Sequence, residues 1–467
     1  MRQLFKVFIP TSIVGLVLSE TVLVFLCYLT GTWLVGRFVN PYLSMPVFLA
    51  DEGGLAQIGI VVACLILGLY FQDLYSDIRV DSLRRLLQQT CLVIGSVLLV
   101  QAFFVYIRKP QLGLPRWAMI FGSSVALISI PTWRIFYTRV ILKIIRSQRV
   151  LFLGVSPICQ EIAAHFVARP EIGRDVIGYL DDEETRQLPG GKIVGQIRDL
   201  TAIATTLRPD VIVVGMTERR RELPMSEMLG LRFSGIRFEE AAATFESAFG
   251  RVSTRELRPS RLVYSSDLGP GRKSLFWHSF VSIVLATVLL ILFAPLMFVL
   301  AMIVKATSHG PVFHRQVRVG LNGSTFTLFK FRSMKVNAEA ESGPVWAKKD
   351  DPRITPPGKW MRRLRFDELP QLLNVLRNEM ALVGPRPERP EFVKSLTEKI
   401  PYYASRHYVK PGITGWAQIN YKYGDTIEDT IMKLEYDLYY IKNITLSLDF
   451  FIILHTLKIM LLSETAQ

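Results

Sequence analysis

The sequence predicts a membrane α/β protein with three parts. The first 145 residues hold long apolar runs, residues 146–230 alternate short strands with helices, and a proline-interrupted apolar run opens a polar C-terminal region. Apolar runs of about 20 residues are typical of bilayer helices, and strand–helix alternation is typical of a parallel sheet. We therefore expect four transmembrane helices, a Rossmann-like α/β domain, and a mixed, mostly helical C-terminal domain that begins with a re-entrant membrane helix.

Four apolar runs in residues 1–145 are each close to the length of a bilayer helix, about 20 residues. They are residues 8–35, 55–71, 86–107 and 117–141. The first run is too long for the core of a signal peptide, so we expect it to stay in the protein. Because four such runs lie within the first 145 residues, buried helices of a soluble protein are a poor alternative.

The basic residues favour a cytoplasmic location for both ends of this helical bundle. Lys and Arg precede the first run, lie between the second and third, and follow the fourth, as the positive-inside rule requires. The net charge is +15, but no basic helix stripe with interleaved aromatics is present, so nucleic acid is not an expected partner. Anionic lipid headgroups and phosphate substrates suit the charge better. The four cysteines form no CxxC pair, which disfavours a disulfide framework or a zinc site.

Residues 146–230 resemble a Rossmann domain with an incomplete phosphate fingerprint. The expected elements are strands at 149–154, 176–180 and 210–215 and a helix at 159–167. The first strand ends at Gly154, but the later glycines of G-x-G-x-x-G are missing, and those glycines let a backbone approach a pyrophosphate. Dinucleotide binding is therefore disfavoured, and a scaffold or regulatory role is preferred. Residues 231–271 are expected to form a connector.

A fifth apolar run, residues 275–304, opens the last expected domain, residues 272–467. Pro295 interrupts this run, and a proline inside a helix removes a hydrogen bond and bends the chain. Basic residues flank the run on both sides, so the positive-inside rule places both ends on the cytoplasmic face. We expect a re-entrant helix kinked at Pro295 rather than a fifth span. Residues 449–462 are too short to span and are expected to lie in the membrane interface, with a buried core helix as the alternative.

Two adjacent acids, Asp367 and Glu368, stand just before a helix-breaking proline. Pro370 is tolerated only in the first turn of a helix, so a helix is expected to begin near the two acids. A helix N-terminus stabilises negative charge and also binds phosphates. An ordinary helix cap is the alternative, but Arg362 and Arg386 on either side favour a site for phosphate chemistry.

Five motifs in this region follow one another in an order that resembles a known family. They are Lys330-Phe331-Arg332-Ser333-Met334, Asp367-Glu368-Leu369-Pro370-Gln371, Gly384-Pro385-Arg386-Pro387, Lys410-Pro411-Gly412-Ile413-Thr414-Gly415-Trp416 and Asp437-Leu438-Tyr439-Tyr440. Their order resembles the catalytic domain of bacterial polyprenyl-phosphate sugar-phosphate transferases, the monotopic phosphoglycosyl transferases. The layout of the first half of the chain resembles the large members, which initiate exopolysaccharide or O-antigen synthesis.

The resemblance implies an enzyme that uses a UDP-sugar and a polyprenyl phosphate, such as undecaprenyl phosphate, and releases UMP. Asp367 matches the nucleophile, which would carry a covalent phosphosugar. Glu368 matches a ligand of Mg²⁺, a cation that prefers carboxylate and phosphate oxygens. Arg362 and Arg386 match positions that contact phosphate.

The remaining matched positions concern the metal region and the membrane. Lys330 and Arg332 lie in a motif near the metal and the diphosphate, and Pro295 matches the break of the family's re-entrant helix. The resemblance places the catalytic domain on the cytoplasmic face of the bacterial inner membrane. The oligomeric state stays open, with a homodimer among the alternatives, and the motifs do not identify the sugar.

The chain departs from the family pattern at two positions. Arg365 stands where many members have a small hydroxyl residue, and Ile444 where many have Trp, but neither change removes a proposed catalytic group. The sequence disfavours two other classes of protein. A membrane-bound nucleotide-sugar dehydratase or epimerase needs an intact glycine fingerprint and a Tyr four residues before a Lys, and both are missing here. A non-catalytic membrane scaffold or nucleotide sensor would not need the two acids with their arginines.

Overall fold

The protein is described from a computed structural model that divides into two compact units. One unit is built mainly from residues 9–238 and the other mainly from residues 239–467. A small sheet of β1 (Arg2–Leu4) and β2 (Val7–Ile9) precedes the first long helix. The described residues are 2–4, 7–42, 44–76, 78, 80, 82–107, 112–144, 147–182, 188–215, 223–256, 271–335, 353–421 and 426–462.

Four long apolar helices of the first unit follow the predicted runs. They are α1 (Thr11–Phe38), α3 (Gly54–Phe71), α4 (Leu83–Tyr106) and α5 (Arg116–Phe136), accompanied by α2 (Met45–Ala50), a π-helical turn (Tyr137–Ile141) and α6 (Leu142–Ile144). Each of the four is long and apolar enough to cross a membrane, as is α12 of the second unit. Together with the parallel sheet described below, these helices confirm a membrane α/β protein.

Helices α1 and α5 pack through glycine. A Cβ atom on Gly31 of α1 would lie 2.5 Å from the backbone nitrogen of Gly122 on α5, and a Cβ on Gly122 would overlap the ring of Tyr28. Small residues let helices approach closely in a membrane. The buried carboxylate of Glu20 on α1 lies 2.6 Å from the guanidinium of Arg134 on α5, so the acid within this apolar run has its counter-ion on the neighbouring helix.

Because Gly31 meets backbone atoms that cannot move aside, Gly31→Leu should destabilise the helical bundle by about 2 kcal/mol or more. The measurement is the thermal unfolding of the full chain in detergent micelles. Gly59→Leu is the matched control, since a Cβ on Gly59 of α3 meets nothing within 4 Å. Equal unfolding temperatures for the two variants would contradict close packing of α1 on α5.

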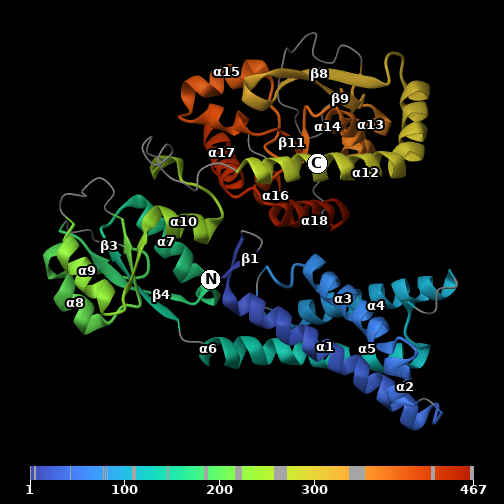
Figure 1. The fold of residues 1–467 in the computed structure, drawn as a ribbon, viewed down its shortest axis with the longest axis horizontal. Coiled ribbons are helices and arrows are strands. Elements are labelled where there is room, and N and C mark those ends of the chain that lie inside the picture. Colours follow the sequence, from blue (N-terminus) through green and yellow to red (C-terminus); the bar gives the residue numbers. More distant parts are fainter. Residues whose placement is uncertain are drawn as a thin grey trace. The chain divides into compact units, whose positions relative to one another are not determined.

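A five-stranded sheet in the order β5-β4-β3-β6-β7 forms the α/β part of the first unit. Its strands are β3 (Gln148–Leu153), β4 (Arg174–Leu180), β5 (Ile193–Gly195), β6 (Val211–Val214) and β7 (Arg237–Glu240), and its helices are α7 (Pro157–Ala168), α8 (Leu200–Leu207) and α9 (Met225–Phe233). Strand β3 pairs in parallel with β4 and β6, which confirms the predicted parallel sheet. In Figure 1, α8 and α9 cover one face of the sheet and α7 covers the other, as in a Rossmann fold.

The loop after β3 is held by contacts within the chain. The Ser156 hydroxyl accepts a hydrogen bond from the backbone nitrogen of Cys159 at 3.4 Å and caps α7. The backbone nitrogen of Val155 donates to the carboxylate of Asp181 at 2.6 Å. Asp181 directly follows β4, so its carboxylate fills part of the loop where a Rossmann domain with intact glycines would approach a phosphate.

Part of the expected connector, residues 231–271, has regular structure. It contributes β7 to the sheet and then α10 (Ala241–Phe249), which belongs to the second unit. Residues 250–256 continue along the second unit, where the Arg251 guanidinium lies 2.7 Å from the Glu435 carboxylate. The Trp416 indole also donates to the Gly250 carbonyl at 2.7 Å. These contacts make α10 and the residues after it part of the C-terminal fold.

The second unit combines one long apolar helix with short strands and helices. After α12 (Arg272–Thr307) come β8 (Phe313–Val319), β9 (Thr325–Phe331), α13 (Pro356–Arg363), the 3-10 helix Phe366–Gln371, α14 (Leu372–Leu376), β10 (Ala381–Val383), α15 (Pro390–Lys399), the 3-10 helix Tyr403–Tyr408, β11 (Gly412–Thr414), α16 (Trp416–Asn420), α17 (Ile427–Lys442) and α18 (Leu446–Leu462). Pro295 lies inside α12, and Figure 1 shows α12 changing direction before it leads into β8.

Both halves of α12 pack against this same unit. In the first half, the His278 ring contacts the Val383 carbonyl at 3.0 Å, and the Ser282 hydroxyl accepts from the backbone nitrogen of Leu382 at 3.4 Å. In the second half, Leu300 and Val304 are buried in a small apolar core with residues of β9 and α13. The apolar side chains in the middle of α12 are largely exposed, as at Ile291 and Leu292.

Candidate active site

The two acids lie in the first turn of a 3-10 helix that leads into α14, so a helix does begin near them, as predicted. The helix Phe366–Gln371 contains Pro370, and the α-helical turns of α14 begin only at Leu372. Arg365, which precedes the 3-10 helix, has a left-handed backbone with φ of 54°. Asp367 and Glu368 are both buried, with exposed fractions of 7% and 8%.

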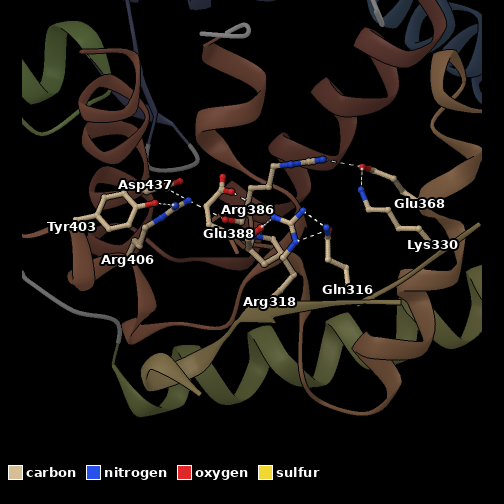
Figure 2. A network of polar contacts seen from close by, with 10 residues as sticks. Gln316, Arg318, Lys330, Glu368, Arg386, Glu388, Tyr403, Arg406 and Asp437 are labelled. Atoms are coloured by element: carbon tan, nitrogen blue, oxygen red, sulfur yellow. Dashed lines mark hydrogen bonds and ion pairs between the residues drawn. The ribbon is translucent and has the colours of Figure 1, made fainter. Parts of the chain in front are cut away.

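The Glu368 carboxylate is surrounded by cations from three different segments. Its Oε1 atom lies 3.0 Å from Lys330 Nζ of β9 and 3.0 Å from Arg386 Nη2 in the loop after β10. Its Oε2 atom lies 3.6 Å from Arg365 Nη1. Figure 2 shows Lys330 and Arg386 meeting at the same carboxylate. The Arg386 side chain is 39% exposed, so the cluster is open to solvent on the side of this arginine.

The surroundings act differently on the two acids. Burial and, after it, the neighbouring Glu368 carboxylate raise the pKa of Asp367 to about 6, although Lys330, Arg362 and Arg386 favour the ionised form. Burial alone would also raise the pKa of Glu368, but Lys330, Arg386 and Arg365 hold it well below its usual range. Glu368 is thus ionised at neutral pH and well below it, whereas Asp367 gains and loses its proton near pH 6 and is mostly ionised at neutral pH.

The strand and helix that carry Lys330 and Arg362 are fixed to each other. The Thr355 hydroxyl accepts from the backbone nitrogen of Gly358 at 3.2 Å and caps α13, whose last turn holds Arg362. A Cβ on Gly358 would overlap the carbonyl of Ser333. Glycine therefore lets α13 approach the chain just beyond β9, and Lys330 lies in β9.

Two glycine-containing motifs meet where Arg386 is positioned. Strands β10 and β11 pair in parallel, with Ala381 opposite Gly412. A Cβ on Gly412 would overlap the backbone nitrogen of Gly384, and a Cβ on Gly415 would overlap the Gly384 carbonyl. These glycines are needed because the two backbones touch. Their contact fixes the start of the loop that carries Arg386.

The structure brings together most, but not all, of the predicted site residues. Asp367, Glu368, Lys330, Arg362 and Arg386 form one electrostatic group.

Arg332 does not join this group. Its guanidinium donates to the carbonyls of Ser308 at 2.8 Å and His309 at 2.9 Å, so it holds the end of α12. Pro295 lies within α12, outside the group.

Two further residues contribute to the candidate site although they are not among the predicted site residues. Arg365 was noted only as a departure from a family pattern, yet it faces Glu368. Asn374 is fully buried in α14, accepts from the backbone nitrogen of Phe329 at 3.1 Å and donates to the Thr327 carbonyl at 2.7 Å, which ties α14 to the strand of Lys330. A polar residue inside the otherwise apolar helix Leu372–Leu376 was the available signal.

The candidate site is a pair of buried carboxylates surrounded by cations, carried by a membrane α/β protein. Such an arrangement is suited to phosphate chemistry. Comparison with known proteins gives the family. Residues 273–463 match the bacterial sugar transferase family. The chain belongs to this family and is therefore an enzyme. This membership confirms the predicted resemblance to the bacterial polyprenyl-phosphate sugar-phosphate transferases.

Several curated relatives are similar over about half to two thirds of the chain. The UDP-N-acetylgalactosamine-undecaprenyl-phosphate N-acetylgalactosaminephosphotransferase of Aeromonas hydrophila is 42% identical over 216 residues, which is 46% of this chain and 50% of the relative. The UDP-glucose:undecaprenyl-phosphate glucose-1-phosphate transferase of Xanthomonas campestris pv. campestris is 33% identical over 327 residues, 68% of each chain. The enzyme of the same name from Escherichia coli (strain K12) is 34% identical over 290 residues, 61% of each.

A nucleophilic carboxylate must be ionised, so a nucleophilic role for Asp367 predicts that transferase activity falls as the pH drops through about 6. Arg362→Met should move this acidic limb to higher pH, since Arg362 stabilises the ionised form of Asp367. The measurement is the pH dependence of kcat/KM for the nucleotide-sugar donor. Arg363→Met, at an exposed neighbour on α13, is the matched control and should leave the limb in place. An acidic limb near the ordinary aspartate value of 3.8 would contradict the assignment.

Proposed function

We propose that this transferase moves a sugar 1-phosphate from a UDP-sugar to undecaprenyl phosphate and releases UMP. The observation that carries the proposal is a buried aspartate, Asp367, beside an acid that is itself fixed by two cations at 3.0 Å. The relatives named for UDP-glucose and for UDP-N-acetylgalactosamine support a UDP-hexose donor and undecaprenyl phosphate as acceptor. A reaction of this kind would initiate the synthesis of an exopolysaccharide or related glycan.

In the first step, an Asp367 oxygen attacks the phosphorus that bears the sugar. The bond from this phosphorus to the oxygen of UMP breaks, UMP leaves with the electron pair, and Asp367 carries a phosphosugar. Covalent catalysis divides one difficult displacement into two easier ones. Arg386, which is partly exposed, and Arg362 are suited to hold the phosphates, since guanidinium groups match phosphate oxygens geometrically.

In the second step, an oxygen of undecaprenyl phosphate attacks the same phosphorus. The bond between the phosphorus and Asp367 breaks, the carboxylate is restored, and the product is a diphosphate-linked sugar lipid. Cations already in place offset the charge that collects on the phosphates. Lys330 and Arg386 contribute in this way while they hold Glu368.

We propose Glu368 as a ligand of a Mg²⁺ ion that takes part in the reaction. No group of three or more His, Cys, Asp or Glu side chains that could hold a metal ion gathers among the described residues. Mg²⁺ is usually held by one or two carboxylates together with substrate phosphates, and Glu368 provides such a carboxylate. When bound, the ion would neutralise phosphate charge.

We further propose that α12 is re-entrant, so that the catalytic unit lies on the cytoplasmic face of the inner membrane. Its first half is bonded to β10 through His278 and Ser282, and its second half packs on β9 through Leu300 and Val304. A helix that crossed the membrane would separate these halves by the thickness of the bilayer, about 30 Å. The exposed apolar middle of α12 is suited to lie among lipid tails.

Asp367→Asn should lower UMP release from UDP-sugars by several orders of magnitude, because the amide is not a nucleophile. The assay mixes the full-length protein, Mg²⁺ and undecaprenyl phosphate with a panel of UDP-sugars. Glu398→Gln, which removes an exposed carboxylate from the same unit, is the control and should retain activity. Normal UMP release by Asp367→Asn would reject the proposed nucleophile, and no release from any donor by the parent would reject the proposed reaction.

The topology of α12 can be tested with cysteines at its two ends. In a background without the four native cysteines, Lys273→Cys and Ala306→Cys place thiols at exposed positions of the first and last turns. A re-entrant helix predicts that a membrane-impermeant maleimide labels both from the cytoplasmic side and neither from outside. Labelling from opposite sides would show that α12 spans.

A further inference from the structure

We propose that Arg406 and Asp437 form a positioning pair for Arg386. The pair fixes the backbone of the loop that carries Arg386, and so sets where the Arg386 guanidinium meets Glu368 and the donor's phosphates. The inference rests on the proposed function, because it assigns the pair a role in that site. Neither residue touches Glu368 in the described contacts, so both act through Arg386.

The pair is buried and ends on the Arg386 backbone. Arg406 Nη2 lies 2.8 Å from Asp437 Oδ2 and donates to the Arg386 carbonyl at 3.0 Å, while Nη1 donates to the Tyr403 hydroxyl at 2.8 Å. The side chains of Arg406 and Asp437 are 8% and 2% exposed. Figure 2 shows this network beside the ion pair of Arg386 with Glu368, at opposite ends of the same arginine.

The loop needs anchors of this kind because of its prolines. Pro385 and Pro387 flank Arg386 and have no backbone N–H to donate. The loop is therefore held mainly through hydrogen bonds that its backbone carbonyls accept. Four successive carbonyls, of residues 385 to 388, each accept a hydrogen bond, and the donors come from three different segments. The donors are Gly412 N at 2.9 Å, Arg406 Nη2 at 3.0 Å, Arg318 Nη1 at 3.0 Å and Val319 N at 2.9 Å, in that order.

Charge explains why Asp437 accompanies Arg406. A buried guanidinium is costly without a counter-ion, and Asp437 on α17 provides one. Burial raises the pKa of Asp437 to about 6, and Arg406 opposes this shift. Since a buried ion pair often adds little net stability compared with apolar packing, stability alone is a weak account of a pair that ends on the carbonyl of Arg386.

A double-mutant cycle tests this inference. Arg406→Met should lower kcat/KM for the UDP-sugar donor about 100-fold, as expected for a displaced substrate-binding group. Arg386→Ala should also lower kcat/KM, but adding it to Arg406→Met should cost little more, because Arg386 is then already misplaced. Arg406→Lys, which keeps the charge but has fewer donors, should recover part of the loss. Asp437→Asn, nearly identical in shape, should show the same coupling if Arg406→Met fails to fold.

Arg251→Met is the matched control. Arg251 is also a buried arginine paired with an acid of α17, Glu435, at 2.7 Å, but it makes no described contact with the Arg386 loop. Arg251→Met should lower thermal stability. In the double variant with Arg386→Ala, the fold-loss in kcat/KM should equal the product of the two single losses, as for independent residues. The same result for Arg406→Met combined with Arg386→Ala would overturn the inference.

The same cycle can be measured as affinity for UDP, without turnover. Arg406→Met and Arg386→Ala should each weaken binding, and the double variant should bind no more weakly than Arg386→Ala alone. If Asp367→Asn still releases UMP, the proposed mechanism fails while coupling in this binding cycle still supports the positioning pair. Independent losses of UDP affinity would refute the pair even if the mechanism holds.

Discussion

The ion pairs of Glu368 are the interaction on which the rest of the site depends. One buried carboxylate oxygen lies 3.0 Å from Lys330 of β9 and 3.0 Å from Arg386 of the loop after β10. Because an unpaired buried charge is strongly unfavourable, the strand, the loop and the 3-10 helix can pack together only when these groups meet. The same packing places Asp367, the preceding residue in the chain, in a positive environment.

The two neighbouring acids have separate properties for a physical reason. Glu368 faces three cations, which keep it ionised, while Asp367 is buried against that fixed negative charge and has a pKa of about 6. Pairs of titratable groups whose surroundings push their pKa values apart commonly divide the work of a reaction between them. The arrangement therefore suits a metal-binding anion beside a nucleophile that is ionised at neutral pH.

Much of the fold was predictable because the signals were strong. Long apolar runs located α1, α3, α4, α5 and α12, and the strand–helix alternation located β3, β4 and β6. The short strands β5 and β7 were missed, since three or four residues carry little periodicity. Helix α10 was missed because its partners on α16 and α17 lie far away in the sequence.

Residues of the candidate site could be predicted only where they belong to a recognisable sequence motif. Adjacent acids and flanking arginines indicated Asp367, Glu368 and Arg386, but no local pattern shows where a long basic side chain points. Arg332 lies two residues after Lys330, yet it holds the end of α12 because the unpaired carbonyls of a helix terminus accept its donors. The role of Arg406 depends on a carbonyl 20 residues earlier in the chain.

The most direct measurement is the mass of the peptide that contains Asp367 after the protein is mixed with a UDP-sugar and Mg²⁺ and quenched rapidly in acid. Without undecaprenyl phosphate, the account predicts a mass increase of one phosphosugar on Asp367, and addition of undecaprenyl phosphate before the quench should remove it. Full turnover with no such adduct, or an adduct on another residue, would contradict the account.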